Sequence, residues 1–411
     1  MSTSDFGADA NYDEAKVGTY SLPDPLIFAD GRRVATADDW RERRAEILRL
    51  FETHVFGSAP PTPGVTFALA AHDAEALGGA AIRRQVAVAV APNAPKLNLL
   101  LYVPREVTAP APVFLGPNFL GNHTVAADPG ILLPKIVFAP DMDVTLPEGR
   151  ATESSRGFQA DRGPLAKIVG RGYAVATFYY GDLFPDRPGG KAESIQPAFE
   201  HAGAEYSWGA LAVWAWAMSR ALDALAQMPE IDAGRAALIG HSRHGKAALW
   251  AGALDERFRL FIANNSGKGG VSLMRRNFGE TIRHLVTRYP HWFADAYRRY
   301  AGCEAELPVD QHMLIALIAP RPVYIASAAD DLWADPKGEF LGALGADPVY
   351  RLLGTDGLAA REGPPLETPA MSTIGYHCRR GGHGVTDYDW DQFLRFADRH
   401  LRAAEPTKAH D

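Results

Sequence analysis

Residues 235–246 read Arg-Ala-Ala-Leu-Ile-Gly-His-Ser-Arg-His-Gly-Lys, and this stretch indicates the fold. Its first five residues are typical of a short buried strand, and the small residues at 247–251 favour a helix. Ser242 therefore lies on a tight strand-to-helix turn between two glycines, which let the elements approach closely. Such a turn exposes the serine hydroxyl to a cleft and aims the next backbone N–H at a developing oxyanion. The pattern departs from the usual G-x-S-x-G because His244 precedes the second glycine, and a plain Gly-Ser turn is the alternative interpretation.

The composition indicates a large folded protein with no charge-driven partner. The chain has 411 residues, 47% of them hydrophobic, which is enough for a large core. Its net charge of −7 and the absence of a Lys/Arg-rich block argue against binding to nucleic acid or to an anionic membrane. No apolar run approaches the roughly 20 residues of a membrane-spanning helix. Cys303 and Cys378 are too few for a disulfide framework or a zinc cluster, so two separate thiols are expected.

The first part of the chain predicts a strap followed by one domain. Residues 1–35 are expected to form an irregular N-terminal strap, and residues 36–411 a single catalytic domain. The start of the strap is polar and acidic and is no signal peptide, so a complete chain would stay in the cytoplasm. Thr36 and Asp39 predict a capping box that opens a helix. Strands are then expected at residues 82–91, 98–103 and 113–118.

The stretch from Gly121 to Gly157 is rich in proline and has little periodicity. Loops of this length in a compact domain are usually binding loops or lids, so we expect it to belong to the site.

Beyond residue 164 the predicted elements alternate. Helices are expected at residues 164–169, 208–228, 309–318, from 336 onward, and at 387–401. Strands are expected at residues 173–180, 235–239, 260–263, 322–327 and 374–378. This alternation predicts an α/β three-layer sandwich, a mostly parallel sheet with helices on both faces.

Two further motifs lie where the catalytic acid and base that act with Ser242 are expected. In a parallel sheet the catalytic groups lie on loops that leave the carboxyl ends of strands. Asp330 and Asp331 follow the strand at 322–327, and His383 lies in a Gly-Gly-His-Gly loop after the last strand. Serine, aspartate and histidine in this order are typical of the α/β-hydrolase triad. The imidazole removes the hydroxyl proton, and the carboxylate fixes its tautomer and stabilises the imidazolium.

His383 and Asp331 are the preferred base and acid. A glycine-flanked histidine at this place is hard to explain by packing, and Asp331 precedes Leu332-Trp333 at the loop tip, whereas Asp330 is interpreted as a loop cap. Five other histidines are interpreted as structural or as too near the serine: His241, His244, His291, His312 and His377.

Over nearly its whole length the chain resembles the bacterial glucuronoyl esterases of carbohydrate esterase family 15. The motifs that carry the resemblance lie at residues 11–18 (Asn-Tyr-Asp-Glu-Ala-Lys-Val-Gly), 240–246, 264–270, 308–313, 332–338 and 382–383. The resemblance implies substrates in which a lignin alcohol or methanol esterifies the (4-O-methyl)-glucuronic acid of glucuronoxylan. Members of this family are usually secreted or periplasmic. The ordered Ser242, Asp331 and His383, with no Cys/His/carboxylate cluster at metal-binding spacing, predict a reaction without a metal or other cofactor. We expect a monomer.

The resemblance assigns roles to individual residues: Ser242 is the nucleophile, His383 the base, Arg243 supports the oxyanion, and Lys246, Glu280 and Trp333 hold the sugar. Lys246 lies one helical turn past the serine and can face the same cleft. A tryptophan after the acid can cover a sugar face and donate its indole N–H. A solvated surface lysine, a core tryptophan and a surface glutamate are the alternatives.

One position departs from the family pattern. Many members carry the triad glutamate directly before Ser-Gly-x-Gly-Gly, where this chain has Asn265. An amide orients an imidazole but does not balance its charge. Some bacterial members place the acid after the later strand, where Asp331 stands, so the departure supports Asp331. Two other functions stay open: another carboxylesterase on the same fold, such as an acetylxylan esterase, and a non-catalytic carbohydrate-binding relative.

Overall fold

A ten-stranded sheet organises the computed structural model, which describes residues 7, 9–61, 64–107, 109–134, 146, 150–202 and 207–402. The strand order is β1-β2-β3-β5-β4-β6-β7-β8-β10-β9. The strands from β5 to β10 along this order pair in parallel, while β1, β2, β3 and the edge strand β9 pair antiparallel. The bounds are β1 Thr66–Ala76, β2 Ala81–Ala89, β3 Leu97–Pro104, β4 Ala111–Asn118, β5 Ala174–Tyr179, β6 Ile231–His241, β7 Leu260–Asn264, β8 Val323–Ala328, β9 Ala370–Met371 and β10 Ile374–Arg379.

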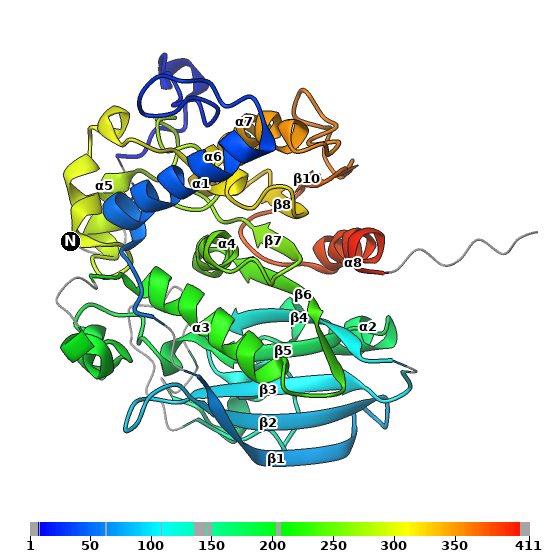
Figure 1. Cartoon of the computed structure of the whole chain (residues 1–411). Coiled ribbons are helices and arrows are strands. Elements are labelled where there is room, and N and C mark those ends of the chain that lie inside the picture. The colour runs from blue at the N-terminus through cyan, green and yellow to red at the C-terminus, as the bar shows by residue number, and fades with distance from the viewer. Residues whose placement is uncertain are drawn as a thin grey trace, which may run out of the picture.

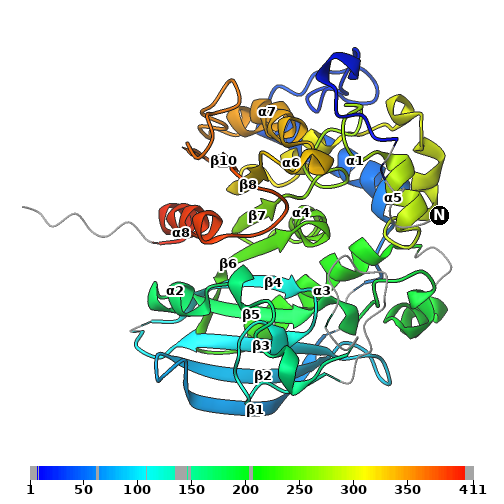
Figure 2. The same cartoon turned by 180° about the vertical axis from the view of Figure 1, so that it is seen from behind.

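Helices cover both faces of this sheet, as Figures 1 and 2 show. On one face lie α1, α3, α4, α6 and α7, and on the other lie α2 and α8. The bounds are α1 Ala37–Phe51, α2 Leu165–Gly170, α3 Ala210–Leu225, α4 Arg243–Leu254, α5 Ile282–Arg288, α6 Gln311–Ala316, α7 Pro336–Leu352 and α8 Asp387–Leu401. The predicted three-layer architecture is confirmed.

Each face has its own hydrophobic core. The larger core contains the buried tryptophans Trp208, Trp214 and Trp216 around α3, which the sequence had assigned to packing. The smaller core lies under α2 and α8 and includes Phe114 and Trp390. Because α3 is apolar on all sides, it is buried almost throughout, as expected for a helix enclosed between the sheet and its neighbours.

The parallel strands bring four loops to one edge of the sheet. The loops after β6, β7, β8 and β10 carry Ser242, the segment 265–280, the segment 329–335 and His383. Residues from four distant parts of the chain therefore meet at the carboxyl ends of the strands.

Most predicted elements are present, with ends that differ by a few residues, and the Thr36–Asp39 capping box is confirmed. Strand β1 was not predicted, because its Ala, His, Asp and Glu side chains are mostly exposed and have low strand propensity. Helix α5 was also missed.

The stretch predicted as a long binding loop, 121–157, lies partly outside the described residues; short 3₁₀ turns occur at Asn122–Thr124 and Glu153–Ser155. The predicted strap contributes Phe28 and Val34 to the larger core, and its separation from the catalytic domain stays a prediction.

Within the described ranges, none of the helices is both long and apolar enough to cross a membrane. The thiols of Cys303 and Cys378 are free, as expected.

Candidate active site

Ser242 occupies a strained backbone position between β6 and α4. Its φ of 56° and ψ of −126° lie where non-glycine residues are rarely found. The turn closes because Gly240 lacks a side chain, since a Cβ there would lie 2.1 Å from the carbonyl oxygen of His244. The Ser242 N–H donates to the Asn264 carbonyl at 2.9 Å, which ties the turn to the end of β7. Half-buried Ser242 thus stands at the N-terminus of α4, where backbone N–H groups are available to an anion.

His383 and Asp331 form a hydrogen-bonded pair beside this turn. Nδ1 of His383 lies 2.7 Å from Oδ2 of Asp331. The Asp331 side chain is buried at 5% exposure, whereas that of His383 is 45% exposed. With Nδ1 turned toward the carboxylate, Nε2 is the ring nitrogen left to exchange a proton with a reactant.

His241 connects this pair to Ser242, which follows it directly in the chain. The centroids of the His241 and His383 rings are 4.4 Å apart. Burial holds the pKa of His241 well below its usual range, and the neighbouring His383 lowers it further. In the part of the chain that the structure describes, no hydrogen bond joins the Ser242 hydroxyl to His383. Such bonds often tighten only when substrate is bound.

The neighbours of Asp331 differ sharply in what they contact. Asn265 is buried and donates its side-chain N–H to Oδ2 of Asp331 at 2.9 Å, the oxygen that also faces His383. Asp330 is exposed, and its backbone N–H donates to the Gly381 carbonyl at 3.0 Å. The structure therefore brings Asp331, and not Asp330, to His383.

Arg379 holds the glycine-rich loop that carries His383. Its Nη2 donates to the carbonyls of Gly382 and Gly384, at 3.1 and 2.8 Å, on either side of the histidine. Its Nε donates to Oδ2 of Asp389 at 2.8 Å, and both side chains are buried. Because glycines leave a loop many conformations, these bonds restrict where the imidazole can lie. The sequence analysis did not single out Arg379.

Arg243 is anchored by a buried aspartate that the sequence analysis also missed. Asp186 forms an ion pair with Arg243 and accepts hydrogen bonds from Nε2 of His291 and Nε1 of Trp292, both at 2.7 Å. Burial alone would raise the pKa of Asp186, but Arg243 and His291 outweigh it and hold that pKa well below its usual range. The guanidinium carbon of Arg243 lies 4.7 Å from the Trp292 ring centroid. This cation–π contact helps to hold the guanidinium on the face of the sheet that α4 covers.

Lys246 and Glu280 form a buried pair, so neither is the surface residue that the alternative interpretations required. Lys246 Nζ lies 3.5 Å from Oε2 of Glu280, with side-chain exposures of 5% and 6%. Lys246 also donates to the carbonyls of Ser266, at 2.8 Å, and of Lys268. Burial lowers the pKa of Lys246, and Glu280 opposes that effect.

Trp333 is half-buried and lies on the loop that also carries Asp331. Its carbonyl accepts the backbone N–H of Glu280 at 3.0 Å, and its ring centroid is 5.1 Å from that of His284. Trp333 and Glu280 are therefore neighbours, and Trp333 is not the core residue of the alternative interpretation.

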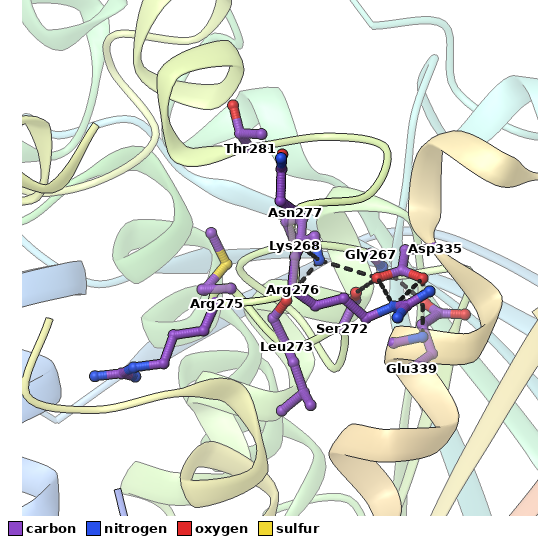
Figure 3. Close-up of polar contacts among 12 residues, drawn as sticks. Gly267, Lys268, Ser272, Leu273, Arg275, Arg276, Asn277, Thr281, Asp335 and Glu339 are labelled. Atoms are coloured by element: carbon purple, nitrogen blue, oxygen red, sulfur yellow. Dashed lines mark hydrogen bonds and ion pairs between the residues drawn. The ribbon is translucent and has the colours of Figure 1, made fainter. Parts of the chain in front are cut away.

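Asp335 links the loop at residues 265–280 to the loop that carries Asp331 and Trp333, and Figure 3 shows its polar contacts. It is fully buried and accepts hydrogen bonds from Lys268 Nζ and Arg276 Nε, both at 3.0 Å, and from Ser272 Oγ at 3.2 Å. Its side chain also caps α7 by accepting the Gly338 N–H at 2.9 Å. The loop with Glu280 and the loop with Trp333 thus share one ionic anchor.

The buried His244 ring stacks on Phe119 without a hydrogen-bond partner among the described residues, whereas the other histidines considered in the sequence have polar partners. His377 lies between Tyr324 and Asp389 at 2.9 Å from each, and His312 Nε2 lies 2.9 Å from the Pro23 carbonyl oxygen. In the described ranges, no three His, Cys, Asp or Glu side chains are grouped so as to hold a metal ion.

Comparisons with known proteins agree on one family. A protein-family model described as glucuronyl esterase, fungi, matches residues 141–354. A carbohydrate esterase from an unknown prokaryotic organism is 46% identical, over 95% of this chain and 92% of its own. A 4-O-methyl-glucuronoyl methylesterase from Schizophyllum commune is 29% identical, over 83% of this chain and 76% of its own.

Solved structures agree with these sequence matches. A promiscuous CE15 esterase from a marine bacterial metagenome superposes with a TM-score of 0.88 at 46% identity, covering 95% of this chain and 100% of that one. A glucuronoyl esterase from Solibacter usitatus gives a TM-score of 0.89 at 44% identity, with the same coverage. The expected α/β-hydrolase fold is confirmed.

Proposed function

Because this chain belongs to the glucuronoyl esterases of carbohydrate esterase family 15, we propose that Ser242, His383 and Asp331 carry out its hydrolysis of glucuronoyl esters. The enzyme is a carboxylesterase that hydrolyses esters of glucuronic acid. The observation that carries the residue assignment is the 2.7 Å contact between His383 Nδ1 and buried Asp331, beside the strained turn of Ser242.

The proposed reaction begins with attack of Ser242 Oγ on the ester carbonyl carbon, while His383 Nε2 takes the hydroxyl proton. The negative charge that develops on the carbonyl oxygen is stabilised by the Arg243 backbone N–H and guanidinium. Collapse of the intermediate breaks the bond to the alcohol oxygen, which leaves with the proton from His383. Water, deprotonated by His383 Nε2, then attacks the acyl carbon. The bond to Ser242 Oγ breaks, Oγ takes the proton back from His383, and glucuronic acid leaves. Asp331, supported by Asn265, stabilises the imidazolium in both steps.

The same site is proposed to hold the sugar through Lys246, Glu280 and Trp333. Without a sugar, the Lys246 ammonium and the Glu280 carboxylate are paired with each other. When a sugar binds, each can exchange part of that contact for a hydrogen bond to a sugar hydroxyl. The half-buried indole of Trp333 offers an apolar face and an N–H donor. We further propose glucuronoxylan joined to lignin alcohols as the natural substrate, and a monomeric enzyme.

A broader esterase activity is the second candidate, because one relative at 46% identity is described as promiscuous. Such an enzyme would hydrolyse acetyl esters as readily as glucuronate esters. A non-catalytic carbohydrate-binding protein is disfavoured by the paired His383 and Asp331 and by the family membership.

The function is tested by the rates of hydrolysis of benzyl glucuronate, methyl glucuronate and p-nitrophenyl acetate, with Ser242→Ala as control. We expect kcat/KM for both glucuronates to exceed that for the acetate. We also expect Ser242→Ala to lose several orders of magnitude in kcat, as on loss of a triad serine elsewhere. Equal kcat/KM on acetate would favour the broader esterase, and activity that survives in Ser242→Ala would refute the assignment.

A further inference from the structure

The N-terminal arm, residues 9–17, is bound to the rim of the site. The Gly279 N–H donates to the Asn11 carbonyl at 2.8 Å, and the Asn11 side-chain amide donates to the Asn277 carbonyl at 2.6 Å. Glu14 is paired with Lys337 at 2.9 Å and with Arg276, which reaches on to Asp335. The arm is therefore tied to the ionic anchor that joins the two sugar-side loops.

The arm also reaches the aromatic side of the site. Nε2 of His284 lies 2.8 Å from Oδ1 of Asp9, and the His284 ring is 5.1 Å from that of Trp333. A Cβ added to Gly7 would lie 2.8 Å from the Trp333 ring, so this backbone lies on the indole. Gly7 lies against the Trp333 ring, and Asp9 is bonded to the histidine that contacts it.

Tyr12 is the residue of this arm that faces outward beside Glu280. Its ring is 45% exposed and packs edge-on against Phe278, with centroids 6.0 Å apart and planes at 88°. Asn11, directly before Tyr12, accepts the N–H of Gly279, the residue before Glu280, so Tyr12 lies next to the start of the Glu280 segment. Partial burial raises the pKa of the phenol, and the carboxylates of Asp331 and Glu280 raise it further. An exposed aromatic ring with a polar tip stands at the mouth of a site built for a sugar ester.

We propose that Tyr12 is a subsite for the pyranose unit of the xylan chain to which the glucuronate is attached. This inference rests on the proposed function, and the burial of Glu280 together with the packing of Tyr12 favours a sugar next to the glucuronate. Glu280 is buried at 6% exposure, so the glucuronate that it would hold lies deeper than the exposed Tyr12 ring. A polysaccharide whose glucuronate is bound at Glu280 must extend outward past the N-terminal arm. The Tyr12 ring packs on Phe278, and Asn11 beside it is bonded to Gly279, so Tyr12 lies against the segment that leads to Glu280.

The chemistry of the ring fits this ligand. A tyrosine offers a broad apolar face for the C–H face of a pyranose and a hydroxyl for one of its oxygens. Asn11 and Glu14 hold the backbone on both sides of Tyr12, so the ring is placed in advance and loses less freedom on binding.

The test compares the methyl ester of glucuronic acid with the same ester carried on xylotriose. Tyr12→Ala should lower kcat/KM for the xylotriose-linked ester about five- to tenfold and leave the monosaccharide ester unchanged. Tyr12→Trp should keep most of the rate on the larger substrate. Phe67→Ala, which removes an exposed aromatic ring from β1 at the far edge of the sheet, is the matched control and should change neither.

Three results would overturn the subsite. Equal losses on both esters would place Tyr12 in the glucuronate site or in the fold, and no loss on either would leave it without a role. A loss on benzyl glucuronate relative to methyl glucuronate, with the xylotriose-linked ester unaffected, would assign the ring to the alcohol. Failure of the wild-type enzyme on the monosaccharide ester would instead refute the proposed function itself.

Discussion

The two sides of Ser242 are built in different ways. On the base side, His383 rests on a glycine-rich loop with its ring 45% exposed, and it is steered by buried groups behind it, Asp331 and Arg379. On the sugar side, Lys246 and Glu280 are themselves buried, and Asp335 locks their surroundings. On the base side, the His383 ring stays accessible, while Asp331 and Arg379 fix its orientation. On the proposed sugar side, the charged groups of Lys246 and Glu280 are paired with each other.

This difference predicts that damage to the base side lowers kcat on every ester, whereas damage to the sugar side depends on the substrate.

The largest effect is expected at the acid. Asp331→Asn should lower kcat by roughly 10⁴-fold on glucuronate and acetate esters alike, as when a triad aspartate becomes an amide elsewhere. Asp330→Asn is the matched control, because Asp330 is exposed one residue away, and it should keep near-full activity. Steady-state kinetics of the two variants decide the point. The reverse order of losses would make Asp330 the acid, and two unaffected variants would mean that the acid lies elsewhere.

A smaller effect is expected from the loop clamp. A lysine at position 379 cannot bond both glycine carbonyls and Asp389 at once. In Arg379→Lys, His383 should therefore be correctly placed to accept the Ser242 proton less often. We expect kcat to fall about 10²-fold at most, with KM little changed, because small misplacements of a catalytic group have effects of that size. Arg380→Lys is the control, since Arg380 is exposed and pairs with Glu367 at the surface. An unchanged kcat in folded Arg379→Lys would show that the clamp does not position the base.

The smallest effect is expected at Trp333. Trp333→Ala should lower kcat/KM on methyl glucuronate about tenfold through lost aromatic contact with the sugar, while hydrolysis of p-nitrophenyl acetate stays nearly constant. Leu332→Ala, which removes an exposed neighbour on the same loop, should affect neither substrate. Parallel losses on both substrates would move Trp333 from sugar recognition to the catalytic machinery or the fold.

Local pattern was enough to predict the parts of the site that follow strands. The Ser242 turn and the order of Asp331 and His383 could be predicted because glycine placement and chain order reflect the sheet directly. The partners that hold them could not. Asp186 and Arg243 are 57 residues apart, and nothing in the local sequence links them.

Asn265 illustrates the same limit within the acid pair. The sequence showed only that an amide replaces the glutamate usual in the family, whereas the structure shows that this amide donates to Asp331 across 66 residues of chain. Likewise, Lys246 was expected to face the cleft, and its burial among backbone carbonyls depends on how the 265–280 loop folds. Strand β1 was not predicted because its side chains do not favour a strand. Its extended conformation depends on backbone pairing with β2, which the local sequence does not show.

The central claim is that Ser242 is a nucleophile activated by the His383–Asp331 pair. Reaction with a serine-directed phosphonate, followed by mass mapping of the labelled peptide, tests it most directly. We predict one label per chain on Ser242, slowed by methyl glucuronate and by His383→Ala and absent in Ser242→Ala. A label on another residue, or no label on an enzyme that still hydrolyses benzyl glucuronate, would contradict the account.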